Sequence, residues 1–414
     1  MVGLATADLR TWQPSRAEGL RRLEAFLPRA GRRYAETRNY DPGPEARDNV
    51  SALSPWIRHR LVTEAEVIRA VRARHSFRAA EKFIQEVCWR TYWKGWLEQH
   101  PAVWHAYRTE VEAGLAALRS DPDLRRSCEA AVEGRTGIAC FDAWARELVA
   151  TGYLHNHTRM WFASIWIFTL KLPWALGADV FLRHLLDGDP ASNTLSWRWV
   201  AGLHTRGKTY LARPGNIETY TQGRFRPGTA LSASAPALSE PPPPPPAPLP
   251  AAQSRPPAEP FGLLLTEDDL RVEDLGLHDG RVLGVAGAVC TTMRSPLGAG
   301  EAAVAFAEGA LQDALDRAGR RFGLTPTPLA EGLDAEEVAA WARGLGVGRV
   351  VTPYAPVGPV QERLERIEVA LKVEGIALLR LRRPWDEAFW PHATKGFFGL
   401  KRQIPGVFAR LGLN

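Results

Sequence analysis

The sequence lacks the residues and motifs that define several large protein classes. It contains only four cysteines, Cys88, Cys128, Cys140 and Cys290, and no Cys-x-x-Cys motif. We therefore predict reduced thiols and a cytoplasmic protein rather than a disulfide scaffold. No His-Glu-x-x-His motif and no Cys/His cluster occurs, so we predict no metal site. Neither a Walker loop nor a nucleophile elbow is present.

Long hydrophobic runs are also missing. The first 20 residues have no uninterrupted apolar core, which predicts no signal peptide. The most apolar run, residues 160–170, ends at Lys171 and has about half the length of a membrane span. It is better interpreted as a buried helix, and we expect no membrane partner. No internal repeat is visible.

Charge and aromatic content are more informative. The formal net charge is +6 and the sequence pI is about 9.3. This excess suits a polyanion such as nucleic acid, and it suits a soluble basic enzyme equally well. Tryptophan (15) outnumbers tyrosine (8), and such large side chains need a packing, stacking or electronic role.

A proline-rich segment divides the chain. Residues 237–260 contain six consecutive prolines, which favour an extended polyproline II spacer. We predict a helical domain at residues 1–230, a Pro-rich linker at 231–260 and an α/β domain at 261–414. We treat the chain as a monomer, because nothing in the sequence specifies its oligomeric state.

The two predicted domains differ in their hydrophobic periodicity. Residues 1–230 show helical spacing, with a capping-box pattern at Thr63 and Glu66 and a C-capping glycine at Gly152. In the C-terminal domain, segments with strand periodicity alternate with segments of helical periodicity. We expect helices and strands in the order typical of a parallel sheet, with strands at 262–266, 281–289, 349–356 and 376–383 and helices at 303–323, 334–346 and 360–375.

Polar residues interrupt an otherwise apolar helix at residues 155–170. Asn156, Arg159 and Met160 are spaced three and four apart, so they share one helix face. A buried arginine needs a carboxylate partner, and Asp187 and Asp189 are the candidates. A structural ion pair between two helices explains the same pattern, and the residues alone leave both interpretations open.

Several ordered segments together carry a family resemblance. Residues 136–168 and 172–202 closely resemble the FAD-binding helical domain of the DNA photolyase/cryptochrome family. Residues 49–57 resemble the loop that holds the flavin phosphates, and residues 85–93 resemble the helix on the lesion side. The resemblance covers residues 40–225 and implies FAD as the cofactor. It leaves the antenna chromophore unknown.

The resemblance implies roles around the flavin. Asn193 matches the position beside flavin N5, where an amide can bond the ring without supplying a titrating proton. Trp197 and Trp174 match the proximal and middle members of the tryptophan chain that photoreduces the cofactor. The third member is open: Trp144 or Trp161 substitutes for it, or the chain is shorter. The implied cofactor-binding set is Tyr40, Ser51, Leu53, Ser54, Arg90, Asn156, Arg159, Asp187, Asp189 and Asn193.

The resemblance also implies a pocket for damaged DNA. Trp89 and Trp199 match an aromatic pair that packs a flipped-out pyrimidine dimer, and simple core packing is the less favoured alternative for both. Glu86, Asn156 and Met160 match further lesion-pocket residues. Asn156 favours cyclobutane dimers over (6-4) lesions, and its neighbours His155 and His157 keep that choice open.

Three departures from the family pattern stand out. Val50 occupies the position where a threonine is expected in the phosphate loop, and Ala139 replaces a proline. The α/β antenna domain of the family normally precedes the flavin domain, whereas here the α/β part follows it. Residues 352–378 resemble the end of that antenna domain, so we interpret residues 261–414 as a permuted, shortened version.

These observations predict a light-dependent flavoprotein. Our first interpretation is that the protein is an enzyme, a carbon–carbon lyase. It would repair cyclobutane pyrimidine dimers in damaged DNA by electron transfer from reduced FAD. The alternative is a cryptochrome-like blue-light sensor that binds FAD without repair, with the α/β part as a docking module. A flavin-binding relic with a structural role is a third possibility.

Overall fold

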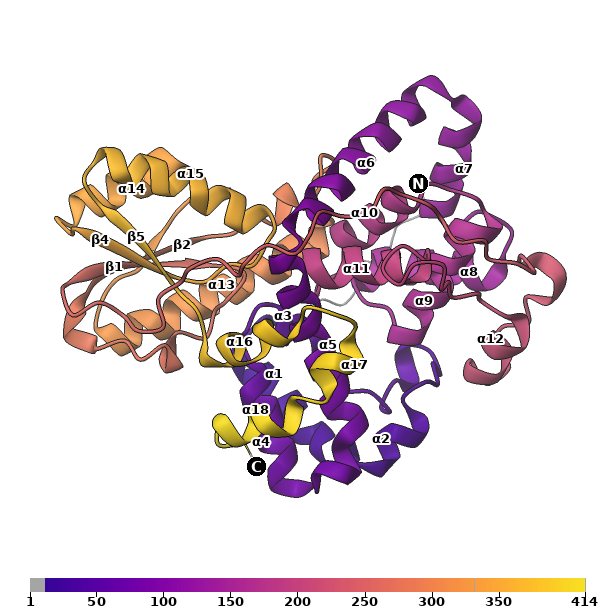
Figure 1. Cartoon of the computed structure of the whole chain (residues 1–414), viewed down its shortest axis with the longest axis horizontal. Coiled ribbons are helices and arrows are strands. Elements are labelled where there is room, and N and C mark those ends of the chain that lie inside the picture. The colour runs from indigo at the N-terminus through magenta and orange to yellow at the C-terminus, as the bar shows by residue number, and fades with distance from the viewer. Residues whose placement is uncertain (1–11, 331, 414) are drawn as a thin grey trace.

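The computed structural model describes residues 12–330 and 332–413 (Figure 1). Residues 1–11, within the segment where the sequence predicts no signal peptide, lie outside the described residues. Within the described part of the chain, no helix is long and apolar enough to cross a membrane. The N-terminal part is helical, with α1 (Arg16–Phe26), α2 (Arg32–Thr37), α3 (Ser54–Arg58), α4 (Glu64–Arg74), α5 (Phe77–Gln99), α6 (Pro101–Ser120), α7 (Pro122–Val132), α8 (Ala139–Thr151), α9 (Asn156–Ser164), α10 (Trp174–His184), α11 (Pro190–Val200) and α12 (Pro214–Tyr220).

Local capping interactions explain where several helices begin and end. The Thr63 hydroxyl accepts from the backbone N–H of Glu66 at 3.3 Å, and the Glu66 carboxylate accepts from the N–H of Thr63 at 2.9 Å. This confirms the predicted capping box. Gly152 ends α8 with φ +65°, the left-handed conformation that favours glycine. Asp189 caps α11 by accepting from the N–H of Ser192 at 2.7 Å.

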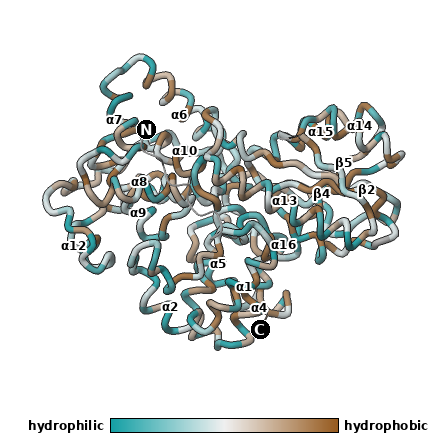
Figure 2. Tube along the Cα trace, turned by 180° about the vertical axis from the view of Figure 1, so that it is seen from behind, coloured by the Kyte–Doolittle hydropathy of each residue, from teal (hydrophilic) through white to brown (hydrophobic). Residues whose placement is uncertain are grey.

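The C-terminal part contains the predicted parallel sheet. Its strand order is β3-β2-β1-β4-β5, and every pairing is parallel. Figure 2 shows hydrophobic segments along the strands, which fits a sheet covered on both faces. The elements are β1 (Phe261–Thr266), β2 (Val282–Ala288), α13 (Glu301–Phe322), β3 (Thr327–Pro328), α14 (Ala335–Gly344), β4 (Arg349–Pro353), α15 (Pro359–Val373) and β5 (Ala377–Leu381).

Side chains of β1 alternate between two hydrophobic clusters. Leu263 joins a cluster that includes residues of α13, whereas Leu264 joins the cluster that includes residues of α14 and α15. This alternation is the period of two that a strand imposes. Helix α13 lies between the sheet and the helical part, since it contacts β2 as well as α1 and α10. The sheet is therefore joined to the helical part through α13.

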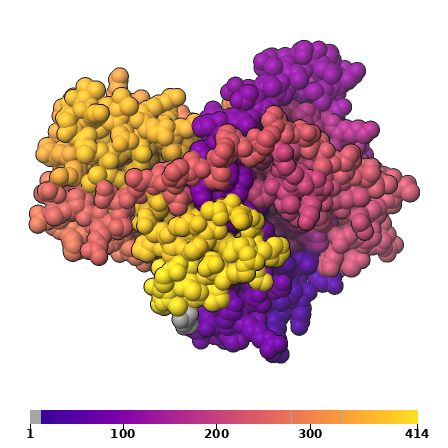
Figure 3. Space-filling model, viewed as in Figure 1, coloured from indigo at the N-terminus to yellow at the C-terminus, as the bar shows by residue number. Residues whose placement is uncertain are grey.

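The chain returns to the helical part after β5. Helices α16 (Pro384–Phe389), α17 (Phe397–Lys401) and α18 (Ile404–Arg410) lie in front of α5 and α4 in Figures 1 and 3. The Trp385 indole N–H donates to Thr91 Oγ1 at 2.9 Å, and Gln99 Nε2 donates to the Trp390 carbonyl at 3.0 Å. These C-terminal helices share the core of the helical part. The sequence analysis predicted none of them.

The proline-rich segment runs across the surface rather than projecting from it (Figure 3). Its backbone is extended, as its composition predicts. The N–H of Leu238 donates to the Ala201 carbonyl at 3.0 Å, and the N–H of Ala247 donates to the Gln99 carbonyl at 2.8 Å. Gln253 forms a parallel bridge with Leu381 of β5. The segment thus connects the two parts while bonded to both.

Candidate functional site

Two buried carboxylates lie in the turn between α10 and α11. Asp187 and Asp189 are 4% and 3% exposed. Helix α10 ends at His184, and Asp189 begins α11 as its N-cap. The short turn fixes both side chains at one end of the two helices. Buried carboxylates require cationic or hydrogen-bonding partners, and four basic side chains supply them: Arg58, Arg90, Lys94 and Arg159.

The predicted pairing of Arg159 with Asp187 is confirmed. Arg159 Nη1 lies 3.0 Å from Asp187 Oδ1, and Arg90 Nη2 lies 3.6 Å from Oδ2. Arg159 is held in place because its Nε donates to the Leu154 carbonyl at 2.9 Å. Burial alone would raise the pKa of Asp187, but Arg159, Arg90 and the Ser54 hydroxyl hold that pKa below its usual value. Asp187 is therefore a stable anion.

Asp189 faces a looser group of cations. Its Oδ2 atom lies 3.5 Å from Lys94 Nζ, 3.8 Å from Arg90 Nη1 and 3.9 Å from Arg58 Nε. Among the described residues, neither Lys94 Nζ nor Arg90 Nη1 has a hydrogen-bond partner, although both atoms are buried. Unsatisfied buried donors are costly. Their presence fits a ligand with polar or anionic atoms at this site.

The predicted phosphate loop lies beside the carboxylates. Ser54 begins α3 and bonds Asp187 through its hydroxyl. The Ser51 hydroxyl accepts from the backbone N–H of Leu53 at 3.4 Å. Tyr40 packs against Tyr220 with ring centroids 5.1 Å apart. The structure therefore brings Ser54 to Asp187 and places Tyr40 against Tyr220.

The predicted electron-transfer residues are buried in the helical part. Asn193 donates from its side-chain amide to the Ala178 carbonyl at 2.7 Å. Trp197 is 2% exposed and packs edge-on against Phe181, with ring centroids 5.1 Å apart. Gly177 permits this packing, because a Cβ there would lie 2.5 Å from the Trp197 ring. Trp174 lies against Tyr107 at 5.8 Å.

The structure offers a further candidate for the third member of the tryptophan chain, which the sequence leaves undecided. Trp144 and Trp161 stack on each other at 5.6 Å, and Trp161 also stacks on His157 at 4.2 Å. Trp166 instead packs at right angles to Trp197, with ring centroids 6.3 Å apart. Trp166, the neighbour of Trp197, is therefore a further candidate for the third member of the tryptophan chain. No pattern in the sequence indicated it.

The two predicted base-stacking tryptophans have different surroundings. Trp199 is half-buried and stacks on Tyr210, with ring centroids 5.8 Å apart. Trp89 is also half-buried, but Phe397 of α17 lies face to face with it at 3.7 Å and an interplanar angle of 12°. One face of Trp89 is thus already occupied. No local pattern in the sequence predicts this contact between residues about 300 positions apart.

The remaining lesion-pocket residues lie on α5 and α9. Asn156 begins α9 and is exposed, and Met160 is half-buried one turn later. Glu86 on α5 forms an ion pair with Arg38. Burial raises the pKa of the Glu86 carboxyl despite this partner. Asn156 is therefore accessible, whereas Glu86 is already paired.

His155 and His157, which left the lesion type undecided, both contact other groups of the protein. His157 contacts the Asn39 carbonyl at 3.0 Å and the Tyr210 hydroxyl at 3.1 Å. His155 is fully buried and caps α9, and burial lowers its pKa to about 3. Neither ring is arranged as a cationic donor at neutral pH.

Sequence reasoning missed two basic residues of this site. Lys94 stands one helical turn after Arg90 on α5, so the i, i+4 spacing could have indicated it. Arg58 ends α3, and the run Arg58-His59-Arg60 directly after an apolar stretch was its signal. Across residues 12–330 and 332–413, no group of three or more His, Cys, Asp or Glu side chains could hold a metal ion.

This arrangement defines a class of site. Buried acids, a ring of cations with unsatisfied donors and adjacent buried tryptophans fit a flavoprotein. The model of the FAD-binding domain of DNA photolyase matches residues 83–224. The helical part of the chain therefore contains a domain similar to the FAD-binding domain of DNA photolyase, as the sequence predicts, and its cofactor is FAD.

Several known proteins are similar to part of this chain. A deoxyribodipyrimidine photo-lyase of Streptomyces griseus is 36% identical over 170 residues, which are 40% of this chain and 36% of that protein. One of Thermus thermophilus is 35% identical over 206 residues, 48% of this chain and 45% of that protein. The solved class III photolyase of Agrobacterium tumefaciens is 28% identical with a TM-score of 0.45, covering 52% of this chain and 45% of that one. The chain spans less than half the length of these relatives.

Proposed function

We propose that this protein uses light to repair cyclobutane pyrimidine dimers in DNA through bound, reduced FAD. The observation that carries the proposal is the meeting of the Arg159–Asp187 pair with the cations around Asp189 at the start of α11, the helix that also carries the buried Trp197. The photo-lyase names of the similar proteins support it further.

The chain's own residues have defined tasks in this proposal. FAD supplies the electron that splits the dimer and then returns. Asp187 and Asp189 stay ionised and hold the surrounding cations in fixed positions. Because an amide does not titrate near neutral pH, Asn193 provides a hydrogen bond without a proton source. Exposed Asn156 and half-buried Trp199 meet the damaged bases.

A second candidate function is a blue-light sensor that binds FAD without repair. One specific observation favours it: Phe397 covers a face of Trp89, the residue that would stack on a flipped base. In this case α17 would be part of the response to light. The two functions differ in whether damaged DNA is bound and repaired.

A repair assay separates the two functions. Reduced, FAD-loaded protein is incubated with an oligonucleotide containing one thymine dimer, in light and in the dark. Repair in light alone supports the photolyase. Bound FAD without repair in either condition supports the sensor. A protein that binds no flavin even after reconstitution contradicts both.

We predict that Trp199→Ala weakens binding to dimer-containing DNA by about ten- to a hundredfold. A stacked base contributes roughly 1–3 kcal/mol, and each 1.4 kcal/mol corresponds to about a factor of ten. Binding to undamaged DNA should barely change, because phosphate contacts dominate it. Both affinities are measured at one salt concentration. Equal losses on the two DNAs would make Trp199 a packing residue.

We predict that Phe397→Ala tightens binding to dimer-containing DNA by about tenfold. An aromatic pair contributes roughly 0.5–1.5 kcal/mol beyond its buried area, and a base must displace it to reach this face of Trp89. Phe398→Ala is the matched control, because Phe398 is 72% exposed whereas Phe397 is 4% exposed. Unchanged or weaker binding by Phe397→Ala would mean that DNA bases do not stack on this face of Trp89.

A further inference from the structure

Three consecutive residues at the C-terminal end of α3 meet the three consecutive residues that follow β1. Arg58 Nη1 donates to Asp268 Oδ1 at 2.5 Å, and Arg60 Nη1 donates to Asp269 Oδ2 at 3.2 Å. Between them, His59 Nδ1 lies 2.7 Å from the Glu267 carbonyl. All of these residues are buried. The helical part and the α/β part therefore meet through a short, aligned set of polar contacts.

Arg58 also reaches the flavin site. Its Nε atom donates to the Gly188 carbonyl at 2.9 Å and lies 3.9 Å from Asp189 Oδ2. The same guanidinium thus contacts Asp268 on one side and the turn carrying both flavin-site carboxylates on the other. A guanidinium holds several acceptors in a fixed, planar geometry. The position of Asp268 therefore determines how Arg58 meets Gly188 and Asp189.

A second arginine supports the same turn. Arg294 Nη1 donates to the Leu185 carbonyl at 3.4 Å, and its Nη2 donates to Glu267 Oε1 at 3.2 Å. Both arginines thus join backbone carbonyls of the turn to carboxylates that follow β1. The α/β part fixes the turn at two points, Leu185 and Gly188.

The negative charge of Asp268 should influence the electrostatic potential at the flavin. Asp268 offsets the positive charge of Arg58, one of three cations around Asp189. Without Asp268, the potential at the site would become more positive. Interactions between buried charges are weakly screened by salt. An anionic reduced flavin would then be favoured over the oxidised form.

We propose that Asp268, on the α/β part, is a positioning residue of the flavin site that acts through Arg58. The α/β part thereby helps to set both the affinity for FAD and its reduction potential. This inference rests on FAD binding and does not require DNA repair, so the two can fail separately.

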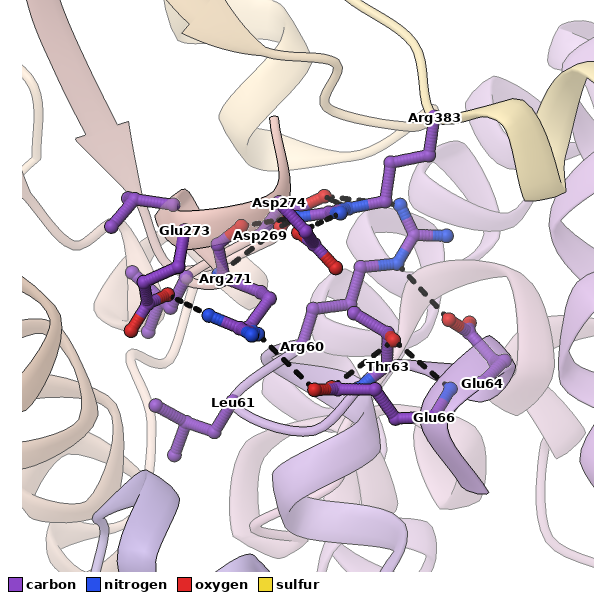
Figure 4. A network of polar contacts seen from close by, with 12 residues as sticks. Arg60, Leu61, Thr63, Glu64, Glu66, Asp269, Arg271, Glu273, Asp274 and Arg383 are labelled. Atoms are coloured by element: carbon purple, nitrogen blue, oxygen red, sulfur yellow. Dashed lines mark hydrogen bonds and ion pairs between the residues drawn. The ribbon is translucent and has the colours of Figure 1, made fainter. Parts of the chain in front are cut away.

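The adjacent carboxylate provides a matched control. Asp269 is as buried as Asp268, but it bonds Arg60 and Arg383 rather than Arg58 (Figure 4). Arg60 pairs with Glu64 and Asp386 rather than with Asp189. Loss of either carboxylate should destabilise the contact between the two parts of the chain. Only the loss of Asp268 should reach the flavin.

The experiment compares Asp268→Asn with Asp269→Asn in the full-length, FAD-loaded protein. We expect both variants to melt at lower temperature. Only Asp268→Asn should shift the flavin midpoint potential to more positive values and weaken FAD binding, by about tenfold as for other residues that orient ligand-holding groups. Asp268→Glu, which restores the charge, should return the potential towards that of the wild type.

Two results would overturn the proposal. One is a wild-type potential and FAD affinity in Asp268→Asn, and the other is an equal shift in Asp269→Asn. If Asp268→Asn does not fold, Arg58→Lys replaces it, because lysine keeps the charge but cannot bond Asp268 and Gly188 in the same fork. Wild-type potential and FAD affinity in Arg58→Lys would equally overturn it. Absence of repair with FAD bound would contradict only the proposed function.

Discussion

Arg159→Ala should yield a protein that is purified almost without FAD. Asp187 is 4% exposed and, among the described residues, would keep only Arg90, 3.6 Å away, as a cationic partner. Removing one member of a buried ion pair costs about 3–5 kcal/mol, because the remaining charge stays desolvated. We therefore expect FAD binding to weaken by roughly a hundredfold to several thousandfold. Flavin absorbance after purification and titration with added FAD measure the loss.

A comparable ion pair outside the site provides the control. Arg183 bonds Asp179 on α10 at 2.9 Å, and Asp179 is 2% exposed. Arg183→Ala should lower the melting temperature but leave the flavin content unchanged. If Arg159→Ala retained FAD at the wild-type level, the Arg159–Asp187 pair would be a structural contact between α9 and the turn before α11.

The predictable part of the site is the part encoded over short distances. Asp189, Asn193 and Trp197 lie on or before a single helix, so their spacing alone places them on neighbouring turns. The capping box at Thr63 is likewise local, because it joins residues three apart. Such features need no knowledge of the tertiary fold.

The contacts between distant segments were not predictable in the same way. Phe397 meets Trp89, and Asp268 meets Arg58, through packing that no short pattern encodes. The proline-rich segment illustrates the same limit. Proline fixes an extended backbone, but it does not specify the surface along which the segment runs.

The surroundings of Trp197 determine what its loss should do. Its ring is buried among Phe162, Phe181 and Trp166 and has no exposed edge for solvent to replace. Phenylalanine at this position would keep most of the packing and leave Asp187 and Asp189 untouched. The substitution would therefore remove an oxidisable indole from the site without disturbing the groups that hold FAD.

Trp197→Phe should bind FAD normally and lose most of its photoreduction. Phenylalanine is much harder to oxidise than indole, so the electron donor nearest the flavin would be missing. Illumination with an added reductant, followed by the decay of oxidised-flavin absorbance, gives the rate. Trp341→Phe is the control, since Trp341 lies on α14 and packs against the hydrophobic cluster of the α/β part instead. It should photoreduce at the wild-type rate. Trp166→Phe tests the neighbouring ring: a loss as large as that of Trp197→Phe would place Trp166 in the chain. Wild-type photoreduction by Trp197→Phe would show that electrons reach the flavin by another route.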